Sequence, residues 1–271
     1  MSASLAAAPP RRANLGLSRL RRVAGGSVAL VGLLAGWLVV GQWELIDPFL
    51  VPPLGAVAGR LLDDIAGGDF ASNAGMTLLR TFTGFAIACA IGVPVGIAVA
   101  RGRLMRWFCE PLISIGFPMP KIAFLPIFIL WFGVYDLSKI VMVAFASVFS
   151  IVASADAGMR GVDKFLIWSA SSMGTRGFAL FRDVLVPAAM PQIFTGLQIA
   201  LPTALITAVA AEMLMGGPGL GGAMLQAGRF ADSVGVYAGI IETATVGMIA
   251  VGAMGQLRRH LLRWHAEFAR R

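Results

Sequence analysis

The residues that could do chemistry in this sequence are a few charged side chains inside or at the ends of long apolar stretches. They are Arg80, Lys121, Glu212 and Glu242. A charge in an apolar environment is costly and often marks a functional position. Lys121 stands among three prolines, at 118, 120 and 126, so the helix must be distorted around it. A cation in a broken helix could attract an anion.

Each of these charges also has a structural interpretation. Lys121 could extend its amine out of the apolar environment or pair with a neighbour. Arg80, at the outer end of its stretch, suits an interfacial arginine with a structural partner. Glu212 precedes a glycine-rich loop at residues 216–222, so it could pair with a cation, cap that loop or act in a gate. Glu242 has no obvious partner, and Met213, beside Glu212, is a further candidate to shape a pathway.

Sequence patterns typical of enzymes and metal sites are absent. There is no His-Glu-x-x-His, no Gly-x-Ser-x-Gly and no Gly-x-x-x-x-Gly-Lys-[Ser/Thr] motif. His260 and His265 lie in a basic tail, and Cys89 and Cys109 adjoin apolar segments, as buried thiols do. We therefore predict no catalytic site, no metal site and no cofactor bound by this chain itself.

The composition favours a membrane protein. Of the 271 residues, 58% are hydrophobic and 13% are charged, whereas a soluble domain is about 45–50% apolar and about 25% charged. This composition excludes a disordered chain and disfavours a soluble globular enzyme. The net charge of +8 would also suit nucleic-acid binding, so the positions of the basic residues must decide its meaning.

Six stretches are apolar enough to cross a hydrocarbon core, which takes about 20 helical residues. They are residues 23–43, 81–100, 111–135, 140–155, 184–211 and 234–257. The fourth is short, so its flanks must complete the span, and Pro187 and Pro191 should delay the start of the fifth helix. Between the first two, residues 54–65 predict a short amphipathic helix on the membrane. The expected fold is all-α, with six transmembrane helices.

Basic residues gather on one side of the membrane if these six spans alternate. The N-terminal tail (1–22), the loops after the second and fourth spans and the C-terminal tail (258–271) hold most of the 22 lysines and arginines. The positive-inside rule then places both termini in the cytoplasm, with residues 23–257 as the transmembrane domain. Membrane topology thus explains the basic charge, and nucleic acid is not an expected partner.

The largest predicted cytoplasmic loop, residues 158–191, is too long and too apolar for a simple connector. Asp163 is a suitable N-cap for a helix over residues 165–173. Gly174 should end that helix, and Thr175 should cap a second one with another apolar face. An exposed apolar surface usually has a partner, but packing against the chain's own membrane helices agrees equally well with the periodicity.

Within this loop the sequence resembles the EAA loop of bacterial ABC importer permeases. That pattern reads Glu-Ala-Ala, three residues, Gly, nine residues, then Ile-x-Leu-Pro. Gly174 and Pro187 match it at the right separation. At its start, Trp168 and Ser169 replace the first two residues, and Ala170 matches the third.

The resemblance extends over roughly residues 50–255 and is to the nitrate/sulfonate/taurine group of these permeases. The matching segments are 50–53, 77–80 with Gly84, 92–96, 118–126, 130–133, 187–191, 211–214 and 219–221. It implies a type I ABC importer permease fold with cytoplasmic coupling helices, in the bacterial inner membrane. The implied partners are a second permease copy as a homodimer, two ATPase subunits that bind ATP and magnesium, and an extracytoplasmic solute-binding protein.

The resemblance also implies a transport role for a small anion such as a sulfonate, taurine or nitrate, with no enzymatic activity in this chain. The implied ATPase-coupling residues are Trp168, Ser169, Ala170, Met173, Gly174, Arg176 and Pro187. The candidate translocation-pathway residues are Lys121, Glu212, Arg80 and Met213. The alternative is a stand-alone secondary transporter or channel, which predicts inverted repeats that the sequence does not show.

Overall fold

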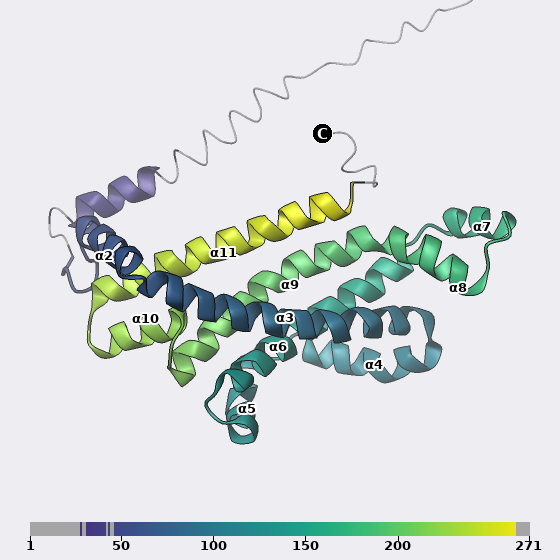
Figure 1. The fold of residues 1–271 in the computed structure, drawn as a ribbon, viewed down its shortest axis with the longest axis horizontal. Coiled ribbons are helices and arrows are strands. Elements are labelled where there is room, and N and C mark those ends of the chain that lie inside the picture. The colour runs from purple at the N-terminus through teal and green to yellow at the C-terminus, as the bar shows by residue number, and fades with distance from the viewer. Residues whose placement is uncertain (1–27, 29–30, 42, 44–45, 264–271) are drawn as a thin grey trace, which may run out of the picture. The chain divides into compact units, whose positions relative to one another are not determined.

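The computed structural model describes residues 28, 31–41, 43 and 46–263, and within these residues the chain is helical and contains no strand (Figure 1). The chain divides into two compact units, residues 1–58 and 59–271. In the first unit, Val31–Gly41 forms a short apolar helix, and the Trp37 indole donates to the Pro52 carbonyl at 2.9 Å. The first predicted span, 23–43, and both basic tails lie partly or wholly outside the described residues.

Four long helices form the frame of the second unit. They are α3 (Asp69–Arg101), α6 (Asp136–Arg160), α9 (Val186–Met215) and α11 (Ser233–Leu261). The shorter helices are α2 (Leu54–Gly67), α4 (Arg103–Gly116), α5 (Leu125–Phe132), α7 (Lys164–Ser172), α8 (Gly177–Leu180) and α10 (Leu220–Arg229). A 3₁₀ turn over Lys121–Phe124 precedes α5, and a π-helical turn over Phe181–Leu185 precedes α9. The position of α2 confirms the helix predicted over 54–65.

The core lies where α3, α6 and α9 pack together. Small residues on α3 allow this, because a Cβ on Gly84, Gly92 or Gly96 would come within 2.5–2.9 Å of atoms of α6. Phe85, Val143, Ile151 and Leu201, from these three helices, form one buried apolar cluster. The close packing fixes the positions of the three helices relative to one another. Polar side chains near the helix ends can therefore meet.

The third predicted span, 111–135, is not one continuous helix. α4 and the segment Lys121–Phe132 meet at an angle of 98°, because prolines at 118 and 120 interrupt the helical hydrogen bonds. α3, α6, α11 and the segment Gly177–Arg229 that contains α9 are each long and apolar enough to cross a membrane. The described residues therefore supply four spans, or five if the bent pair is one span, and six spans are not confirmed.

Several helix boundaries differ from the limits of the apolar stretches. α3 begins at Asp69, well before residue 81, and α6 extends the fourth stretch at both ends, as its shortness required. Pro187 lies in the first turn of α9, but Pro191 lies inside that helix and does not delay its start. An internal proline costs a helix about 3 kcal/mol, and here the buried Ala189 and Ile193 on either side hold the helix together.

Candidate functional site

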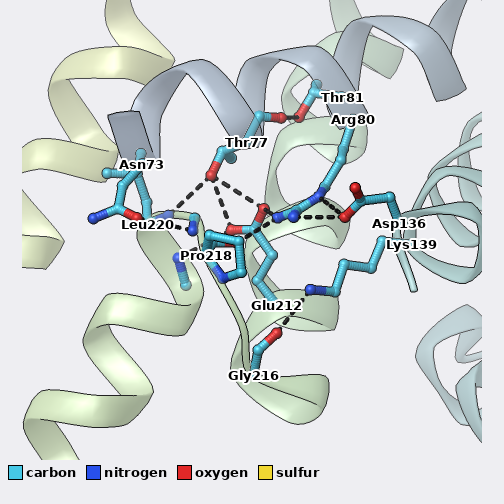
Figure 2. Close-up of polar contacts among 12 residues, drawn as sticks. Asn73, Thr77, Arg80, Thr81, Asp136, Lys139, Glu212, Gly216, Pro218 and Leu220 are labelled. Carbon is cyan, nitrogen blue, oxygen red and sulfur yellow. Dashed lines mark hydrogen bonds and ion pairs between the residues drawn. The ribbon is translucent and has the colours of Figure 1, made fainter. Parts of the chain in front are cut away.

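A buried ion pair joins α3 to the end of α9. Arg80 Nη1 lies 2.5 Å from Glu212 Oε1, and the two side chains are 1% and 0% exposed. Thr77, one turn before Arg80, donates its hydroxyl to Glu212 Oε2 at 2.9 Å. Figure 2 shows both α3 side chains directed at this carboxylate. A buried charge is costly unless it is paired and hydrogen-bonded in this way.

Arg80 has two further partners on separate segments. Its Nη2 lies 2.6 Å from Oδ1 of Asp136, which opens α6 and has a half-exposed side chain. Its Nη1 also donates to the carbonyl of Pro218 at 2.7 Å. One guanidinium therefore links α3, α6, α9 and the loop after α9.

That loop, residues 216–219, runs into the start of α10 and is held through its backbone. Lys139 Nζ of α6 donates to the Gly216 carbonyl at 2.7 Å. The Gly219 amide donates to the side chain of Asn73 at 2.9 Å, and the Leu220 amide donates to the Thr77 hydroxyl at 3.0 Å. We call Asn73, Thr77, Arg80, Asp136, Lys139 and Glu212 the Arg80 network (Figure 2).

The sequence builds this network from helical spacing. Asn73, Thr77, Arg80 and Gly84 recur every three or four residues and so lie on one face of α3. Gly84 lets α6 approach that face, which brings the first turn of α6 to Arg80. Gly219 has a φ of 126°, and a Cβ there would lie 2.5 Å from the Glu212 carboxylate, so only glycine fits.

The network is balanced in charge. The two cations, Arg80 and Lys139, face the two anions, Glu212 and Asp136. Arg80 is occupied by two carboxylates and a carbonyl, so in this conformation it offers no free charge to a transported anion. Its geometry instead fixes the loop after α9 to three helices.

The other two pathway candidates lie outside the network. Lys121 is in the 3₁₀ turn before α5, where its Nζ donates to the Phe117 carbonyl at 2.6 Å. Met213 is in the last turn of α9, with 39% of its surface exposed. Of the four candidates, the structure therefore brings together Arg80 and Glu212 only.

Thr77, Asp136 and Lys139 belong to the network but are not singled out by the sequence analysis. For Asp136 and Lys139, the sequence signal is the position of two charges at the start of the fourth apolar stretch. The topology predicted from the six apolar stretches puts the start of the fourth stretch on the same side as Arg80 and Glu212. Charges of opposite sign at neighbouring span ends on one side can pair, and this arrangement indicates the network.

The segment between α6 and α9 exposes aromatic side chains. Asp163 caps α7, since its side chain accepts the Phe165 amide at 2.8 Å, which confirms the predicted N-cap. Phe165 and Trp168 are 72% and 60% exposed, and their rings meet edge to face with centroids 5.4 Å apart. Met173, which follows α7, is 80% exposed. Figure 1 shows α7 and α8 at the opposite end of the long helices from α10.

The remaining residues of this segment follow the predicted helix–glycine–helix pattern in part. Ser169 is exposed and Ala170 is buried on α7, and Gly174 ends that helix with a φ of 89°. The exposed Arg176, not Thr175, is the N-cap of α8, so the predicted Thr175 cap is wrong. Gly177, with a φ of 59°, is the first residue of α8. A cap at Thr175 would instead have started this helix at residue 176.

Metal binding has no support in the described residues, where no three His, Cys, Asp or Glu side chains are grouped to hold an ion. Cys89 and Cys109 are free thiols and are partly buried.

A family model and two relatives of known name place the chain in the same family of transport proteins. The family model described as the binding-protein-dependent transport system inner membrane component matches residues 92–263. The taurine transport system permease protein TauC of Escherichia coli (strain K12) is 34% identical over 257 residues, which is 93% of this chain and 92% of that protein. The putative aliphatic sulfonates transport permease protein SsuC of Bacillus subtilis (strain 168) is 27% identical over 236 residues, 87% of this chain and 86% of that protein.

One solved structure supports the fold. It is a chain from the inward-facing conformations of the MetNI methionine ABC transporter, with a TM-score of 0.54 and 22% sequence identity. The match covers 67% of this chain and 94% of that chain. At this identity the similarity concerns the arrangement of the helices alone.

Proposed function

This chain belongs to the family of binding-protein-dependent transport system inner membrane components, and from this premise we propose that it forms the pathway of an ATP-driven importer for a small sulfonate. The family makes the chain a transport component of an ABC importer, not an enzyme, with ATPase and solute-binding partners. Membership favours this function over a stand-alone transporter or channel. The names of two relatives, one for taurine and one for aliphatic sulfonates, support the substrate class.

The exposed aromatic end of α7 carries the second part of the proposal, that the 161–185 segment contacts the ATPase. Phe165, Trp168 and Met173 are largely exposed and come from one short, capped helix and the residue after it. Large aromatic side chains at the centre of an interface supply much of its binding energy. Movement of an ATPase that holds α7 would reach α9 through the π-helical turn at Phe181–Leu185.

We also propose that two copies of the chain assemble as a homodimer around the pathway, with both termini in the cytoplasm. An apolar groove of 590 Å³ between α9 and α11 supports the second copy, with Leu205, Ile206 and Met248 among its lining residues. The excess of arginine near the α7 end and in the tails supports the orientation.

Co-purification tests the contact with the ATPase. We expect Trp168→Ala to weaken ATPase binding about 30-fold, because truncating an interface hot spot costs about 2 kcal/mol or more. The control is Trp131→Ala, which removes a similarly exposed indole (66%) from α5. The measurement is the affinity of the purified permease for the purified ATPase. Equal affinities for the two variants would contradict the assignment of α7.

A further inference from the structure

A cavity of 330 Å³ lies among α2, α3, α10 and α11, at the opposite end of the long helices from α7 (Figure 1). Small-molecule pockets span about 300–1,000 Å³, so this one has room for a small solute. Its charged lining residues are Arg60, Asp64, Asp69, Asp232 and Glu242. The cavity thus has four carboxylates against one guanidinium, and it favours a cationic group.

Arg60 is already paired. Its guanidinium lies 2.8 Å from Asp64 and 3.0 Å from Asp232, and Asp64 raises the pKa of Arg60 above its ordinary value by accepting a hydrogen bond. Asp232 also caps α11 by accepting the Gly235 amide at 2.9 Å. Asp69, in the first turn of α3, is stabilised by the helix dipole. These three aspartates therefore have structural partners of their own.

Glu242 differs from them. It is 7% exposed, and within the described residues its Oε1 is buried without a hydrogen-bond partner. Of the other four charged residues that line the cavity, Asp64, Asp69 and Asp232 are anions and only Arg60 is a cation. An unpaired buried carboxylate is costly, and a cation from outside the chain would remove that cost.

We propose that this cavity binds the primary ammonium group of a small organic solute, with Glu242 as the anionic partner. An ammonium group has three N–H donors and no acceptor, which suits a lining rich in carboxylates. A metal ion fits less well, since in the described part of the chain no three acidic side chains are grouped to coordinate one. In identifying the solute the inference rests on the proposed function, because an aminosulfonate such as taurine carries such an ammonium group.

Binding to the purified permease–ATPase complex in lipid nanodiscs tests this proposal by calorimetry with three probes. Ethylammonium carries only the cation, ethanesulfonate carries only the anion, and taurine carries both. We expect ethylammonium and taurine to bind and ethanesulfonate not to bind at this site. Glu242→Gln should weaken ethylammonium binding at least about tenfold, because the amide oxygen still accepts a hydrogen bond but the negative charge that pairs with the ammonium group is lost.

Two further variants serve as controls. Asp63→Asn removes a carboxylate that is exposed on α2 and does not line the cavity, so it should leave binding unchanged. Glu242→Asp keeps the charge, so it should retain more affinity than Glu242→Gln even if the glutamine variant folds poorly.

The outcomes separate the inference from the proposed function. Ethanesulfonate binding as tightly as ethylammonium, or wild-type affinity in Glu242→Gln, would overturn the ammonium site. If ethylammonium binds and taurine does not, the result would support the ammonium site and overturn an aminosulfonate as its ligand. If ethylammonium binds but the complex imports no sulfonate, the proposed substrate class fails and the ammonium site stands.

Discussion

At the scale of single residues, the buried pair of Arg80 and Glu212 joins two charges that the fold removes from solvent. Both side chains are inaccessible to solvent, and each has further partners that hold it in place. Removing one member of a buried pair leaves an uncompensated charge, at a cost of about 3–5 kcal/mol. By contrast, exposed pairs such as Arg60 with Asp64 contribute about 0–1 kcal/mol.

We therefore expect Arg80→Met to lower the free energy of unfolding by about 3–5 kcal/mol, and Arg60→Met by less than about 1 kcal/mol. Glu212→Gln should fall between them, because Arg80 keeps Asp136 and the Pro218 carbonyl. The measurement is denaturant unfolding of the purified chain in detergent. Similar losses in Arg80→Met and Arg60→Met would show that the network does not stabilise the fold.

Gly219 is a second test at this scale. Its φ of 126° and its contact with the Glu212 carboxylate leave no place for a Cβ. Gly219→Ala should cost about 1–3 kcal/mol from backbone strain alone. Gly59→Ala is the matched control, since a Cβ there meets nothing within 4 Å on helix α2, and it should be neutral or stabilising. An unchanged unfolding midpoint for Gly219→Ala would contradict this description of the loop.

At the scale of elements, apolar runs predicted α6, α9 and α11 well, because each is a single long helix whose charges lie mainly at its ends. They failed at 111–135, where apolar residues continue through prolines that bend the chain by 98°. Hydropathy indicates that a segment is apolar, but it does not show whether the helix axis continues straight or bends within that segment. The order of the stretches indicates that Arg80 and Glu212 lie on one side, but 132 positions separate them, and only packing brings them into contact.

The turn after α7 is the element whose backbone can be tested most simply. Gly174 has a φ of 89° and open space around it, so any cost of substitution comes from the backbone. We expect Gly174→Asn to keep ATP-driven transport, because asparagine tolerates this region, and Gly174→Val to lose most of it. The readout is uptake per ATP hydrolysed, with unfolding as the control for stability. Equal coupling in both variants would exclude a role for this turn geometry.

At the scale of the whole second unit, α6 and α9 connect its two candidate functional ends. α9 has 30 residues and so is about 45 Å long. It begins after the α7–α8 segment and carries Glu212 in its last turn, while α6 begins at Asp136 and ends before α7. The Arg80 network ties the far ends of both helices to the loop after α9. Under the proposed contact of α7 with the ATPase, a displacement of α7 would reach that loop through α6 and α9, which pack closely together.

ATP-driven uptake of labelled taurine into proteoliposomes tests the central claim most directly. The vesicles contain this chain and its ATPase, with the solute-binding protein supplied on the opposite side of the membrane from ATP. We expect uptake that requires all three proteins and ATP, and that falls at least about tenfold in Trp168→Ala but not in Trp131→Ala. Uptake that proceeds without the ATPase, or that is the same in both variants, would contradict the account.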